Sequence, residues 1–115
     1  MLPEESPAPV LEALSSELES SPIASVAAFA VRVRELAREK SVPKIEERLI
    51  ELEHELIESV MSSLPATESG ALRDQIARSL RDAKLDEKTR RRTEEANLRR
   101  AVRERFGLPR LTLFR

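Results

Sequence analysis

The stretch PKIEERLIELEHELIESVMSS, residues 43–63, decides the predicted fold. At about 100° per residue, its apolar side chains cover about half of the helix circumference. A helix at the edge of a bundle needs only a narrow apolar stripe, so this broader surface predicts neighbours on two sides. We therefore expect residues 43–63 to form the central helix. The apolar set, extended to the residue before Pro65, is Ile45, Leu49, Ile50, Leu52, Leu56, Ile57, Val60, Met61 and Leu64.

Prolines and a glycine punctuate the rest of the chain. Pro22 and Pro43 suit a first helical turn, where the missing N–H removes no hydrogen bond. Asp86 can cap the last helix, and Gly107 can take the left-handed conformation after its end. The second helix should pair with the central one, and the first and fourth should lie outside. The predicted helices are 8–20, 22–40, 43–63, 66–84 and 86–106.

Length and composition restrict the fold class. The 115 residues allow one domain, 36% of them are charged, and only 3% are aromatic. We predict an all-α protein: a small antiparallel helical bundle of four to five helices with a basic C-terminal helix and an extended C-terminal arm. Its expected parts are a flexible N-terminal arm (1–9), a helical bundle core (10–85), a basic charged helix (86–106) and an extended apolar C-terminal arm (107–115).

Composition also excludes several function classes. The chain has two Gly, no Cys and one His, which excludes glycine-rich phosphate loops, thiolate catalysis and zinc fingers. Its longest apolar run, residues 26–31, falls far short of the ~20 residues that span a membrane. We expect a cytoplasmic protein without a membrane partner, and not an enzyme: no catalytic residue, cofactor, metal or small-molecule substrate.

Two residues of the central helix need separate interpretation. Glu53 falls within the apolar arc, and a buried carboxylate needs a cation, for which Arg32, Arg34 and Arg73 are candidates. Glu-x-x-His spacing, as used by di-iron helical bundles, occurs at residues 51–54. Glu51 and His54 lie on the polar side of the helix, and no second His exists. The spacing therefore does not indicate a metal site.

Charge divides the chain into an acidic and a basic part. Residues 1–65 hold 6 basic and 13 acidic residues, whereas residues 66–115 hold 14 basic and 8 acidic ones. Lys88, Arg92, Arg99 and Arg103 share one face of helix 86–106 and could follow a phosphate backbone. Alternatively, opposite charges at i,i+4 simply stabilise a solvated helix. No aromatic residue is interleaved with these arginines, so base stacking is not indicated.

The last residues have an unusual apolar pattern. Leu111 and Leu113 alternate with polar residues as in a strand, and Leu108 and Phe114 flank them. A lone extended segment either folds back over its own bundle or docks on a partner or a second copy. We predict a non-enzymatic interaction or assembly protein, an adaptor or small subunit of a larger complex, that docks through Leu108, Leu111, Leu113 and Phe114. The alternative is a nucleic-acid-binding subunit that uses the basic face of helix 86–106.

Overall fold

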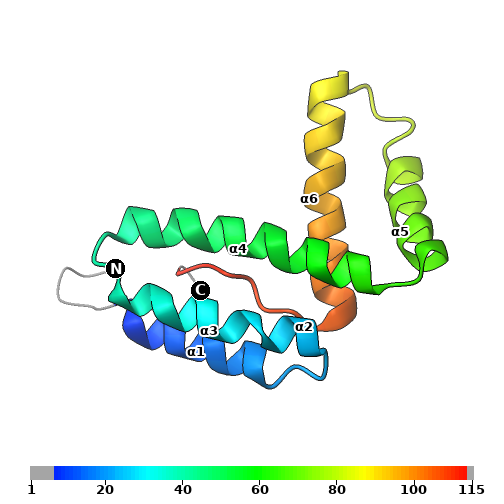
Figure 1. The fold of residues 1–115 in the computed structure, drawn as a ribbon. Coiled ribbons are helices and arrows are strands. Elements are labelled where there is room, and N and C mark those ends of the chain that lie inside the picture. Colours follow the sequence, from blue (N-terminus) through cyan, green and yellow to red (C-terminus); the bar gives the residue numbers. More distant parts are fainter. Residues whose placement is uncertain (1–6, 114–115) are drawn as a thin grey trace.

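The computed structural model describes residues 7–113, which form an all-α fold without a strand (Figure 1). Its extents are 48 × 31 × 17 Å. The described residues form two parts: a helical lobe, consisting of α1 to α4 with residues 107–113, and the α5–α6 hairpin. The elements are α1 (Ala8–Glu19), α2 (Ala24–Ala27), α3 (Phe29–Glu35), the 3-10 helix η1 (Leu36–Arg38), α4 (Val42–Ser63), α5 (Ala66–Ser79) and α6 (Glu87–Phe106).

The core of the lobe lies along α4, the helix predicted to be central. Leu49 and Leu52 are fully buried, and α4 contacts α2, α3 and α6. Facing it, α1 buries Leu11, Leu14 and Leu18. Ser15 is also buried, and its hydroxyl donates a hydrogen bond to the Ala30 carbonyl at 3.0 Å. Its polar atom is therefore satisfied within the core.

The segment predicted as one helix over 22–40 differs in two ways. It begins at Ala24 and is interrupted at Ala28, whose φ of −62° and ψ of −24° are typical of a 3-10 turn. It continues as α3 and η1, and α3 packs mainly against α1 rather than against α4. Ala30 and Val33 are fully buried on this segment. The expected pairing of this segment with α4 is therefore present, but its contact with α1 is larger.

Ile50 was predicted to be buried, but its side chain is 60% exposed. It lies on the same face of α4 as Ile57 and Met61, at about 100° per residue. These two residues are buried, because α6 crosses α4 near its C-terminal end (Figure 1). The same face remains open one to two turns earlier. The position of the crossing helix, rather than the periodicity, decides which residues of this face are covered.

The ends of α6 match the sequence prediction. The Asp86 carboxylate accepts a hydrogen bond from the Thr89 amide at 2.8 Å, so Asp86 is the N-cap. Gly107 has φ 63° and ψ 35°, the left-handed conformation expected after a helix end. By contrast, α5 ends at Ser79, five residues before its predicted end. The break between the last two helices, which the predicted boundaries place near residues 84–86, therefore already begins at residue 80.

The α5–α6 hairpin stands away from the lobe (Figure 1). Near the lobe, its two helices are held together by Leu72, Ile76, Leu98 and Val102, and by an ion pair of 3.8 Å between Glu68 and Arg105. No residue between Ile76 and Leu98 is buried. The outer half of the hairpin thus has no apolar core.

Residues 108–113 turn back after Pro109 and run along the lobe, between α4 and the α1–α3 layer (Figure 1). They have neither helical nor strand structure. The side chains of Leu108, Leu111 and Leu113 are buried and belong to the same hydrophobic cluster as the helices. This part of the chain therefore completes the core of the lobe. Phe114, the fourth residue predicted for docking, lies outside the described residues.

Candidate functional site

Glu53 joins α4, α6 and the C-terminal segment. The Arg103 guanidinium donates to Glu53 Oε1 at 2.5 Å, and the Leu111 amide donates to Glu53 Oε2 at 3.2 Å. Both charged side chains are only 17% exposed. The prediction that Glu53 needs a cation is confirmed, but Arg103 supplies it. Two of the predicted cations bind elsewhere, Arg32 to Glu55 and Arg34 to Glu12 and Glu19.

The four residues predicted as one phosphate track are not one surface. Arg103 is used by Glu53, and the Arg99 side chain is 25% exposed and lies 4.0 Å from Glu95. Lys88 and Arg92 are exposed on the outer half of α6. The structure therefore divides the predicted track into two outer residues that are available and two inner residues that pack at the lobe.

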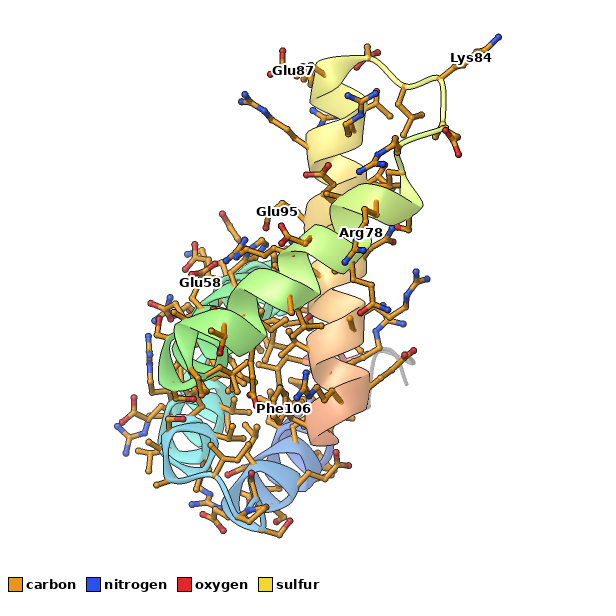
Figure 2. All side chains as sticks on the ribbon, turned by 90° about the vertical axis from the view of Figure 1, so that its right-hand side faces the viewer. Glu58, Arg78, Lys84, Glu87, Glu95 and Phe106 are labelled. Atoms are coloured by element: carbon orange, nitrogen blue, oxygen red, sulfur yellow. The ribbon has the colours of Figure 1, made fainter. Side chains whose placement is uncertain are left out.

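A larger group of cations surrounds the outer pair. We call residues 78–92 the hairpin tip; it contains seven basic and three acidic residues, a net charge of +4. Every one of the basic side chains is exposed, and Figure 2 shows Lys84 pointing outward from the loop between the helices. The basic residues of the tip are Arg78, Arg81, Lys84, Lys88, Arg90, Arg91 and Arg92.

The acidic residues of the tip neutralise little of this charge. Glu87 pairs with Arg91 at 2.8 Å, the only ion pair within the tip. Asp86 is committed to its cap, and the hydrogen bonds from Thr89 hold the pKa of its carboxyl below the ordinary value. Six of the seven cations have no carboxylate within 4.0 Å in this part of the structure. The tip therefore presents unneutralised positive charge.

Arg78 and Arg81 from the α5 side and Arg90 from α6 line an open hollow between the two helices. Its volume is about 580 Å³, and Asp74, Ala77 and Glu94 complete the lining. These arginines were not among the predicted contacts, because Arg78 and Arg81 lie outside helix 86–106 and Arg90 lies off the predicted face of that helix. The close spacing of Arg78 and Arg81, three residues apart within the helix predicted over 66–84, was the available signal.

A second hollow lies between α4, α6 and the C-terminal segment. It has a volume of about 280 Å³, with Leu49 and Leu111 among the lining residues. Its charged residues are Glu46, Glu53, Arg99 and Arg110, so opposite charges are equal in number. Exposed Ile50 and His54 lie at its edge. Because Glu53 is already bound, this hollow presents no clear electrostatic preference.

Leu108, Leu111 and Leu113, predicted to bind a partner, are buried within their own chain. In this conformation they do not form an exposed docking surface. Among residues 7–113, no group of three or more His, Asp or Glu side chains could hold a metal ion. None of the helices there combines the length and the apolar character required to cross a bilayer.

No protein-family model, curated protein or solved structure matches this chain.

Proposed function

We propose that this protein is a non-enzymatic binding protein that holds the phosphate backbone of a nucleic acid at the hairpin tip. The observation that carries this proposal is the net charge of +4 over residues 78–92, on exposed side chains with a single ion pair. Phosphates supply the opposite charge at high density, about one per 1.7 Å of duplex axis.

The clustered positive charges of the tip repel one another, which destabilises the tip in the isolated protein. Like charges one helical turn apart, such as Lys88 and Arg92, destabilise a helix. Between Ile76 and Leu98, no buried apolar side chain compensates for this repulsion. A bound polyanion would remove this repulsion. The clustered charges would then serve binding, whereas a surface that is only solvated has no need of them.

The proposed contacts are to phosphates rather than to bases. The tip has no aromatic residue on which unpaired bases could stack. Its long cationic side chains suit backbone contacts, which position a protein without reading sequence. We therefore propose a duplex, bound with little sequence preference, as the ligand. Lys88 and Arg92 remain proposed contacts, and Arg99 and Arg103 do not.

The test is fluorescence anisotropy with a labelled 20-base-pair DNA duplex between 50 and 200 mM salt. Lys88→Glu combined with Arg92→Glu should weaken binding by at least about tenfold, because two phosphate contacts are lost and two carboxylates repel the backbone. The dependence of the affinity on salt should also become less steep. The matched control is Arg38→Glu with Lys44→Glu, which makes the same charge change at exposed positions of the lobe. Far-UV circular dichroism checks that both variants keep their helices.

Three results would contradict this function: no binding at 50 mM salt, an affinity independent of salt, or equal losses in the tip and control variants.

Assembly through the C-terminal segment is a second candidate function. Its basis is that residues 108–113 have no regular structure, and that the buried residues among them are the three leucines. If this segment left its own lobe, it could bury the same leucines in a second copy or another protein. Light scattering of the full chain should then give a mass above 13.0 kDa that rises with concentration. A monomer at every concentration would remove the case for self-assembly.

A further inference from the structure

We propose that one phosphate group binds in the hollow between Arg78, Arg81 and Arg90, where it bridges α5 to α6 and completes the hairpin tip. This inference rests on the proposed function, since it assigns one backbone phosphate of the bound duplex to a defined place. The proposed site goes beyond that function, because residues from both sides of the hairpin form it and a bound phosphate would hold α5 and α6 together.

The first support is the incomplete contact between the two helices. Near the lobe, Leu72, Ile76 and Leu98 are buried between them. Beyond this level, Leu80, Ala83 and Leu85 are only half-buried, and no residue up to 97 is fully covered. Helices in water depend on apolar packing for most of their stability. Little therefore holds the outer parts of α5 and α6 to each other.

The second support is the charge that faces the hollow. Three arginines from the two sides line it, and none has a carboxylate within 4.0 Å. Arg78 Nε donates a long hydrogen bond of 3.4 Å to the Asp74 carbonyl oxygen, which neutralises no charge. Asp74 and Glu94 also line it, each one helical turn nearer the lobe than Arg78 and Arg90, respectively. The hollow is therefore acidic toward the lobe and basic toward the tip. At its basic end, like charges repel across the two helices.

A phosphate group matches this basic end in charge and geometry. The planar guanidinium forms two parallel hydrogen bonds to phosphate oxygens, whereas an ammonium acts as a point charge. The three basic residues that line the hollow are all arginines, and the two lysines of the tip, Lys84 and Lys88, lie outside it. One tetrahedral anion can accept hydrogen bonds from both helices. It would replace repulsion between the helices by attraction of each to a shared centre.

The consequence is a local stabilisation that a merely electrostatic surface would not produce. Hydrogen–deuterium exchange of the full chain is measured alone, with inorganic phosphate, and with the 20-base-pair duplex, at constant ionic strength. Exchange in residues 77–92 should slow by roughly tenfold at about ten times the dissociation constant of each ligand. Exchange in α1 and α4 should not change.

Matched variants separate the hollow from the rest of the tip. Arg78→Gln with Arg90→Gln removes two of its guanidinium groups, and Lys88→Gln with Arg92→Gln removes the same charge outside it. Both should weaken duplex binding, but only the first should abolish the protection of 77–92. The comparison of wild-type protein with and without ligand remains informative even if a variant unfolds.

The outcomes distinguish this inference from the proposed function. Duplex binding without protection of 77–92, or protection that survives Arg78→Gln with Arg90→Gln, overturns the phosphate site and leaves the proposed function intact. Protection by inorganic phosphate without duplex binding supports the site with free phosphate as its ligand, and contradicts the nucleic-acid function. Protection by neither ligand overturns the site.

Discussion

The lobe and the hairpin tip are both helical, but different forces hold them. In the lobe, α4 contacts α2, α3 and α6 and buries Leu49 and Leu52 completely. In the tip, residues 78–92 bury no side chain, and their local structure depends on the Asp86 cap and the Glu87–Arg91 pair. Helical secondary structure alone therefore says little about where the stability of this chain lies.

The same difference assigns stability to the lobe and the proposed binding function to the tip. Charges of the lobe are paired: Glu53 binds Arg103 at the inner end of α6, and Arg32 binds Glu55 within the lobe. The tip leaves six of its seven cations without an ion pair and keeps them exposed. A surface that binds a polyanion must have unneutralised charge, which is tolerable here because the lobe supplies the folding energy.

The largest effect is expected in the core of the lobe. Leu56→Ala should lower the free energy of unfolding by about 2–5 kcal/mol, since a fully buried leucine leaves a cavity. Leu80→Ala, at the half-buried base of the tip loop, is the control and should cost much less. Urea unfolding followed by circular dichroism at 222 nm measures both, because the chain has no Trp or Tyr. Equal losses would mean that the tip is packed as firmly as the lobe.

The Glu53–Arg103 pair should have the next largest effect. Both side chains are mostly buried, so Glu53→Gln or Arg103→Gln should cost about 1.5–3 kcal/mol, typical of a hydrogen bond to a charged group. A double-mutant cycle isolates the pair from the Leu111 contact that Glu53 also makes. The exposed Arg32–Glu55 pair is the control, where about 0–1 kcal/mol is expected. Similar coupling energies for the two pairs would contradict the assigned role of Glu53.

The smallest effect is expected at the exposed cap of α6. The pKa of Asp86 is lowered in the folded protein by the hydrogen bonds from Thr89. Its stabilisation is therefore present above the unfolded pKa, about 3.9, and is lost as the pH falls through the lower folded value. Asp86→Ala should speed amide exchange of Thr89 near neutral pH, and the difference from wild type should disappear in acid.

Asp86→Asn is the control for this pH dependence, since asparagine also caps helices but does not ionise. It should keep the Thr89 amide protected in acid as well as near neutral pH. An acid-dependent loss of protection in this variant would assign the effect to another group.

Features determined within one or two helical turns could be predicted from the sequence. The start of α6 at Asp86 and its end before Gly107 follow from local hydrogen bonds and backbone conformation. The central position of α4 follows from its broad apolar surface. The need of Glu53 for a cation was predictable for the same reason, since Glu53 falls within the apolar arc of its own helix.

The tertiary structure decided the rest. Arg103 is 50 residues from Glu53, and Leu111 is 58 residues away, so no local pattern identified them as its partners. Ile50 is exposed and Met61 is buried on the same face of α4, because α6 crosses only one end of that helix. The hollow of Arg78, Arg81 and Arg90 likewise exists only because the α5–α6 hairpin brings both helices together. The sequence by itself determined the helical character of the chain and the central place of α4, because both follow from local apolar patterns. The packing of distant segments decided which apolar residues were covered, which charges were neutralised and which remained free to bind.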